Sequence, residues 1–145
     1  MAKNETVAFM GGEDFMIKLD RLETDVNEIA KKAIYAGVEI VADRMRINLK
    51  GVLSEKATGE LVEALGVTPI TLLNGSWTGK IGFKGGDAGY DSKGVAFQLI
   101  ARVLESGTST QKKRPFMRKT INETRKQVEE VMIKTIDDEM KRIFG

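Results

Sequence analysis

Residues 67–83 read VTPITLLNGSWTGKIGF, two short runs rich in β-branched and aromatic residues on either side of Asn74-Gly75. Asn-Gly between two apolar runs is the strongest short hairpin signal, because both turn residues must adopt positive φ. We therefore expect antiparallel strands over 67–73 and 76–83. Pro69 has no N–H to donate, which indicates an edge strand or a late strand start. One face of the second strand is expected to be buried, and its residues are Trp77, Ile81 and Phe83.

Before this hairpin, the spacing of apolar residues predicts a long helix. Two stripes recur every three or four residues, one formed by Phe15, Leu19, Leu22, Val26, Ile29 and Ala33, the other by Ala30, Ile34, Val38, Val41 and Met45. Glu13 and Asp14 favour a helix start and Gly51 a stop, so we expect a helix of about 35 residues, roughly 50 Å long. A helix longer than a small domain is wide should contact other subunits. Two helices separated near Gly37 are the alternative, because glycine costs about 1 kcal/mol in a helix interior.

Two shorter segments lie between this helix and the end of the chain. Ser54 or Thr58 can cap a helical turn that runs through residues 60–65. Residues 95–104, VAFQLIARVL, fit either a buried helix or a strand, and we favour the helix.

A C-terminal helix completes the expected fold. Pro115 suits its first position, and apolar residues at helical spacing continue to about Phe144. We therefore expect one α+β domain over residues 1–145. It has a long N-terminal helix and a small antiparallel sheet with a hairpin, on which a helical segment and the C-terminal helix pack.

The segment 84–94, KGGDAGYDSKG, is polar and rich in glycine. Such a segment cannot hold a core, so it should project from the sheet. We expect it to become ordered only on assembly and to contact neighbouring subunits. The residues of this candidate interface loop are Lys84, Gly85, Gly86, Asp87, Tyr90 and Lys93.

Basic residues are concentrated in 112–126, which holds seven of them and one acidic residue, Glu123. Such a cluster attracts nucleic acid or an acidic partner. We favour a solvated helix start or a subunit contact, because no aromatic-rich or recognition-helix pattern accompanies it. The candidate basic contact residues are Lys112, Lys113, Arg118 and Lys119.

Composition narrows the available chemistry. The 145 residues include no cysteine and no histidine, which excludes disulfides, thiolate nucleophiles, Ser-His-Asp triads and Cys/His zinc sites. Asp91 and Glu105 can in principle form a carboxylate pair, but nothing in the sequence sets their separation. We therefore expect no catalytic residue, no cofactor, no metal and no enzymatic activity. The sequence also shows no secretory signal and no apolar run of 18 residues, so we expect no membrane insertion.

Three short segments follow the long helix in order: Thr58-Gly59-Glu60-Leu61, Leu104-Glu105-Ser106-Gly107-Thr108 and Arg114-Pro115-Phe116-Met117-Arg118. In order and spacing they resemble the neck or tail-component proteins of tailed bacteriophages. Members of that family show Thr-Gly-x-Leu, Glu-aromatic-Gly-Thr and Ala-Arg-Pro-Phe segments, the last of which leads into the final helix. Here Ser106 replaces the aromatic residue, Lys113 replaces the small residue before Arg-Pro, and Lys56-Ala57 stands where the family often has a proline. The matching structural residues are Thr58, Gly59, Leu61, Glu105, Gly107, Thr108, Arg114, Pro115 and Phe116.

Physical roles can be expected for four of these residues. Gly107 should adopt a positive φ, and Thr108 should bond to nearby backbone in the turn. Phe116 should anchor the last helix to the sheet. Arg114 is a candidate ion-pair partner for Glu105, a contact that would hold the loop closed.

The resemblance implies a structural virion protein without catalysis. It implies a ring of six or twelve copies, closed by head-to-tail interfaces, in the head–tail connector of a tailed phage or prophage, assembled in the host cytoplasm. The implied partners are other copies of the chain, adjacent head-completion or adaptor proteins, tail-terminator or tail-tube proteins, and DNA that passes through the lumen without sequence recognition. The alternative is a cytoplasmic nucleic-acid-binding module that uses residues 112–126.

Overall fold

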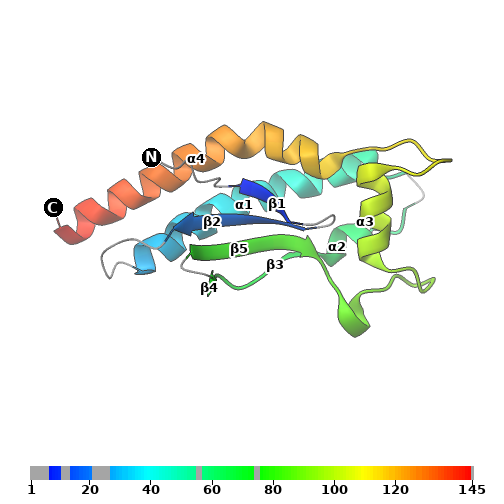
Figure 1. The fold of residues 1–145 in the computed structure, drawn as a ribbon, viewed down its shortest axis with the longest axis horizontal. Coiled ribbons are helices and arrows are strands. Elements are labelled where there is room, and N and C mark those ends of the chain that lie inside the picture. The colour runs from blue at the N-terminus through cyan, green and yellow to red at the C-terminus, as the bar shows by residue number, and fades with distance from the viewer. Residues whose placement is uncertain (1–6, 11–13, 21–26, 55–56, 74–75, 145) are drawn as a thin grey trace.

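A computed structural model describes residues 7–10, 14–20, 27–54, 57–73 and 76–144. Its elements are β1 (Val7–Met10), β2 (Asp14–Asp20), α1 (Asn27–Val52), α2 (Glu60–Ala64), β3 (Leu65–Val67), β4 (Thr71–Leu73), β5 (Ser76–Phe83), the 3₁₀ turn η1 (Gly86–Ala88), α3 (Phe97–Ser106) and α4 (Phe116–Phe144). The chain has the expected α+β architecture, with helices packed on a small antiparallel sheet (Figure 1). No helix among the described residues is long and apolar enough to cross a membrane.

The long N-terminal helix begins at Asn27, so the predicted start near Asp14 is wrong. Residues 14–20 instead form β2, which pairs with β1 and with β5 in antiparallel register. Phe15 and Leu19 lie four residues apart, a spacing that fits a helix but also fits every second residue of a strand. Leu22 and Val26 of the predicted stripe lie outside the described residues.

The sheet has the strand order β1-β2-β5-β3, and β4 also pairs with β5. The single strand predicted over 67–73 is therefore two strands on one edge of β5, interrupted at residues 68–70 around Pro69. Thr68 bridges the interruption, since its N–H donates to the Lys80 carbonyl at 2.9 Å and its Oγ1 accepts the Lys80 N–H at 3.1 Å. Of the two alternatives that Pro69 indicated, the edge position is confirmed and a late strand start is wrong, because β3 begins at Leu65, before the proline. Leu73 pairs with Ser76, and the predicted turn residues between them lie outside the described residues.

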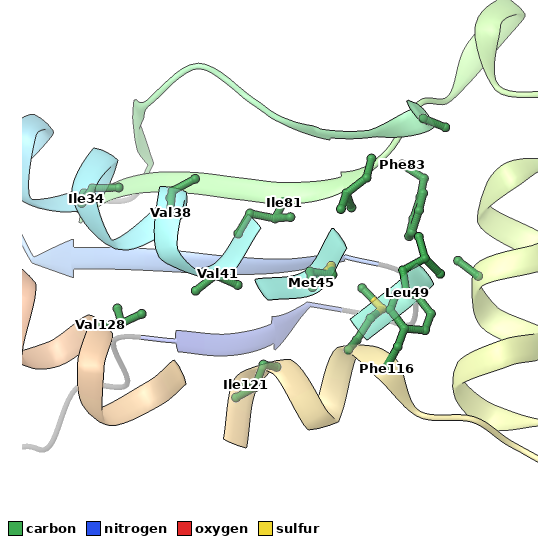
Figure 2. Close-up of a cluster of buried hydrophobic side chains, with 14 of the residues drawn as sticks. Ile34, Val38, Val41, Met45, Leu49, Ile81, Phe83, Phe116, Ile121 and Val128 are labelled. Carbon is green, nitrogen blue, oxygen red and sulfur yellow. The ribbon is translucent and has the colours of Figure 1, made fainter. Parts of the chain in front are cut away.

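Helix α1 is the central element of the fold, with β5 on one side and α4 on the other (Figure 2). The buried face of β5 was predicted correctly, because Trp77, Ile81 and Phe83 are all buried. Gly79 lies on the same face, where a Cβ atom would lie 2.9 Å from a methyl group of Val38. The apolar stripe of α1 is buried from Ile29 to Leu49, whereas Tyr35 and Ile47 on other faces of the helix are exposed. The expected contact of α1 with other subunits stays a prediction.

Helix α1 runs unbroken through Gly37, which rules out the alternative of two helices. A Cβ atom at Gly37 would lie 3.1 Å from Val128 and 3.2 Å from the Met132 sulfur. The glycine therefore allows α4 to approach closely, and tight packing offsets its low helix propensity. The two helices lie antiparallel, as shown by the ion pair between Lys32 and Glu139.

The C-terminal elements agree with the sequence. Residues 97–106 form a helix, α3, which decides the helix-or-strand question at 95–104. Pro115 directly precedes α4, and its carbonyl accepts the Lys119 N–H at 3.1 Å. Phe116 is fully buried and packs edge-to-face on Phe83 of the sheet, with ring centroids 6.1 Å apart, as predicted. In Figure 1 the last turns of α4 extend beyond the start of α1.

Candidate functional site

The three segments that carry the family resemblance meet at one end of the molecule, where α1 ends (Figure 1). This end contains α2, α3, the loop 84–94 and the loop 107–115, and we call it the α3 end. The contacts below show that each segment holds two or more elements together. The candidate site is therefore an assembly of structural contacts rather than a catalytic cleft.

Glu105, at the end of α3, caps the start of α4. One carboxylate oxygen accepts the Met117 N–H at 2.7 Å, and the other accepts the Arg118 N–H at 3.0 Å. The first N–H groups of a helix have no partner within the helix, and the helix dipole favours negative charge there. Glu105 therefore satisfies two of these N–H groups.

Arg114 does not pair with Glu105, so the predicted ion pair is wrong. The Arg114 guanidinium donates to the Val52 carbonyl at the end of α1 (2.8 Å), and its backbone N–H donates to the Leu104 carbonyl (2.6 Å). The last carbonyls of a helix lack partners and attract a cation. The Glu105 carboxylate thus binds N–H groups at the start of α4, and the Arg114 guanidinium binds a carbonyl at the end of α1. Together with the Leu104 contact, these two residues join α1, α3 and α4.

The turn after α3 requires its glycine. Gly107 has φ +74°, as predicted, and a Cβ there would lie 2.8 Å from the Lys113 nitrogen. Thr108 bonds to local backbone, also as predicted, since its Oγ1 accepts the N–H of Gln111 at 3.0 Å and of Thr110 at 3.3 Å. The polar loop 107–115 is therefore a defined connection between two helices.

The Thr58–Leu61 segment forms the start of α2 and holds the loop 84–94. Gly59 has φ +86° directly before α2, and Leu61 is buried in the core. The Glu60 carboxylate accepts three hydrogen bonds: from the Ser92 N–H (2.9 Å), the Ser92 hydroxyl (3.0 Å) and the Thr58 hydroxyl (2.9 Å). The helical turn predicted over 60–65 is confirmed as far as Ala64, and Leu65 begins β3. Its N-cap residue is Gly59 rather than Ser54 or Thr58, although Thr58 Oγ1 accepts the Glu60 N–H at 3.3 Å.

The loop 84–94 projects from the end of β5, as expected (Figure 1), but it has a defined conformation in a single chain. Asp91 Oδ1 accepts the Lys93 and Val95 N–H groups at 2.9 and 2.8 Å. Gly86 has φ +63°, and a Cβ at Gly89 would lie 2.8 Å from the Gly85 backbone. The expectation that this loop becomes ordered only on assembly stays a prediction. The remaining candidate residues, Lys84, Asp87, Tyr90 and Lys93, are exposed at its surface.

A small cavity of about 210 Å³ lies between the end of α1, α2, α3 and this loop. Its wall is mostly apolar, including Leu53, Phe97 and Ile100, with Glu60 and Ser92 at the polar side. The two carboxylates have different partners, since Asp91 accepts the Lys93 and Val95 N–H groups and Glu105 accepts the Met117 and Arg118 N–H groups. Within the described residues no group of three or more acidic side chains could hold a metal ion.

The candidate basic residues are exposed and spread over two elements. Lys112 and Lys113 lie on the loop before α4, and Arg118 and Lys119 lie on its first turns. They share the α3 end but do not form a groove with aromatic side chains among the described residues. The arrangement suits contact with an acidic surface better than base recognition.

Sequence reasoning missed a polar cluster between α1 and α4. Asn48 is buried, and its amide donates to Thr120 Oγ1 at 2.9 Å and to Glu123 at 2.8 Å. Glu123 also receives two hydrogen bonds from Arg44, at 2.9 and 3.2 Å. The hydrogen bond from Arg44, supported by that from Asn48, lowers the pKa of Glu123 to about 2. The available signal was Asn48 itself, a polar residue beside the apolar stripe of α1.

No protein-family model, curated protein or solved structure matches this chain.

Proposed function

We propose that this chain is a structural virion protein of a tailed phage or prophage, and that it forms a ring in the head–tail connector. The observation that supports this proposal is the meeting of the three resembling segments at the α3 end. Glu60, Glu105 and Arg114, one from each segment, all bind groups of the chain itself. Segments that were short and separate in the sequence thus form one connected structure, which is what a shared fold requires.

The proposal involves no catalysis. The carboxylates of Glu60, Asp91 and Glu105 accept hydrogen bonds from backbone and hydroxyl donors, so these three are not arranged as a general acid–base pair. In this role the protein joins adjacent head-completion or adaptor proteins to tail-terminator or tail-tube proteins. DNA passes through the lumen of the ring without sequence recognition, and the protein is located in the virion.

Two measurements test the proposal. Sedimentation and negative-stain microscopy of the purified full chain should reveal a ring of six or twelve copies, either alone or on a connector that contains the portal. Immunodetection should find the protein in purified phage particles, and adjacent genes should encode portal, capsid and tail proteins. A chain that stays monomeric, is absent from particles and lies among housekeeping genes contradicts the proposal.

A nucleic-acid-binding module is the second candidate, and the exposure of Lys112, Lys113 and Lys119 favours it. In that case the monomer should bind duplex DNA with an affinity that falls steeply as salt rises, because each phosphate contact releases counterions. Lys112→Gln/Lys113→Gln should reduce that salt dependence. A ring that retains its size after the same double substitution, with no duplex binding by the monomer, decides against this candidate.

A further inference from the structure

The first half of α4 presents an outer face of basic and polar side chains. Ile121 and Val128 lie on the inner side of the helix, toward α1 (Figure 2). The opposite side carries exposed residues spaced three, four or seven positions apart, which on a helix share one face. We call this surface the basic face, and its residues are Lys119, Asn122, Arg125 and Lys126. Its three cations form no hydrogen bond or ion pair with the described part of the chain.

The fold directs the one acidic side chain of this segment away from the basic face. Glu123 is the only acidic residue in 112–126, which holds seven basic ones. Its carboxylate pairs with Arg44 of α1 at 2.9 Å, so it lies toward α1 and already has a cation as its partner. Further along the same helix the exposed charges do pair with each other, as Lys134 does with Asp138 at 2.8 Å. The basic face therefore lacks the alternating, ion-paired charges of an ordinary solvated helix surface.

The cations also begin at the end of α4 where the helix dipole opposes them. The first turn of α4 has no acidic residue, but it includes Arg118 and Lys119. Cations are unfavourable at a helix N-terminus, and the capping carboxylate comes from Glu105 of α3 instead of from α4 itself. A local arrangement that costs stability is expected at functional positions. The positive end of the dipole adds to the field of the basic face, so the two together favour an anionic partner.

The chemistry of the basic face fits phosphate groups better than a protein surface. None of the exposed large hydrophobic side chains among the described residues lies in 112–126, whereas the centre of a protein–protein interface is apolar. Lys119 and Lys126 lie two turns apart, about 10 Å along the helix axis, so several cations face one strip of a long polyanion at once. The face has no aromatic side chain that could stack on a base. Such a surface holds a nucleic-acid backbone without reading its sequence.

We propose that the basic face of α4 contacts the phosphate backbone of duplex DNA. This inference rests on the proposed function, because it names the surface that meets the DNA in the lumen of the ring. In Figure 1 this half of α4 lies along one long side of the molecule, with α1 on its inner side. In a ring each copy contributes the same face, so many weak contacts to one duplex add up through multivalency.

Fluorescence anisotropy of a labelled duplex with the full chain tests the proposal. Lys119→Gln/Arg125→Gln/Lys126→Gln removes the three charges of the basic face. We expect this variant to bind at least about tenfold more weakly at low salt. The slope of log affinity against log salt should fall by about 2–3, because each lost phosphate contact contributes about 0.9. If the triple variant does not fold, Arg125→Gln and Lys126→Gln alone should each lower the slope by about 0.9.

A second triple variant is the matched control. Lys50→Gln/Lys84→Gln/Lys141→Gln removes three exposed charges outside the basic face, so the two triple variants have the same net charge. The control should bind the duplex within about threefold of the wild type, because only long-range attraction is reduced. Equal weakening by the two triple variants, or no duplex binding by the wild type at about 0.1 M salt, overturns the proposal.

Two further outcomes separate the proposal from its neighbours. Polyglutamate that competes for the basic face as well as a duplex of equal charge indicates an acidic protein partner and overturns the DNA contact. Rings that bind no duplex overturn the contact but leave the connector role intact. Conversely, duplex binding through the basic face by a chain that is absent from phage particles supports the contact and refutes the connector role.

Discussion

Replacement of Glu105 should destabilise the protein by releasing the start of α4. In the structure its two carboxylate oxygens accept the Met117 and Arg118 N–H groups at 2.7 and 3.0 Å. A hydrogen bond to a charged group contributes about 1.5–3 kcal/mol, and loss of a helix cap costs about 0.5–2 kcal/mol. Because the site is partly exposed, we expect Glu105→Ala to lower the free energy of unfolding by about 2 kcal/mol.

The assay is urea unfolding followed by circular dichroism, with the slope of the transition unchanged. A loss of about 2 kcal/mol corresponds to a fall in melting temperature of about 6 °C for a domain of this size. Glu105→Gln keeps one carbonyl oxygen as an acceptor and should lose about half as much. Glu130→Ala, on the exposed face of α4, is the control and should change stability by less than about 0.5 kcal/mol. Hydrogen exchange gives a local reading, because the Met117 and Arg118 amides should lose protection.

A double-mutant cycle with Arg114 tests whether Glu105 and Arg114 bind separate groups, as in the structure, or form the ion pair expected from the sequence. The two side chains bind different groups, so Glu105→Ala and Arg114→Ala should add, with a coupling energy below about 0.5 kcal/mol. A direct ion pair predicts a larger coupling. The cap is refuted if Glu105→Ala is as stable as the wild type, or if protection at Met117 is unchanged.

Three further predictions follow from the core and its turns. Glu123 has a folded-state pKa of about 2, below its ordinary value of 4.5, so its stabilising contribution should be complete above pH 4.5 and disappear as the pH falls toward 2. The free energies of unfolding of the wild type and of Glu123→Gln should therefore change differently with pH in this window. Parallel pH dependences would contradict the Arg44 and Asn48 contacts. Gly79→Ala should lower the free energy of unfolding by about 1–3 kcal/mol, because its Cβ would lie 2.9 Å from a valine methyl group of α1. Gly66→Ala is the control in the same urea assay and should leave stability almost unchanged, because nothing lies within 4 Å of a Cβ there. Gly107→Ala should lower the free energy of unfolding by about 1–3 kcal/mol, because Gly107 has a positive φ and a Cβ there would meet the backbone. Gly51→Ala, on a helix with nothing within 4 Å, should raise it by about 0.5–1 kcal/mol. Equal melting temperatures for the two variants would be the contrary result.

The local parts of the fold could be read from the sequence because their causes are local. The apolar stripe from Ile29 to Leu49, the buried face of β5 and the edge position indicated by Pro69 each depend on residues a few positions apart. The positive φ at Gly107 follows from glycine's freedom in the turn after an apolar segment. In these places pattern and structure agree, because side-chain periodicity and backbone restriction act before any distant contact forms.

The tertiary structure alone decided the rest. Phe15 and Leu19 fit a helix or a strand equally by spacing, and the hydrogen bonds of β5, some 60 residues away, make the segment a strand. Glu105 and Arg114 could pair with each other by charge, but folding brings a helix start to one and a helix end to the other. Unpaired N–H and carbonyl groups at helix ends arise only when helices stop at particular places and pack side by side. Residue patterns therefore predicted the helices α1, α3 and α4 and the strand β5, whereas packing between distant elements made residues 14–20 a strand and set how the charged residues that join the elements are used.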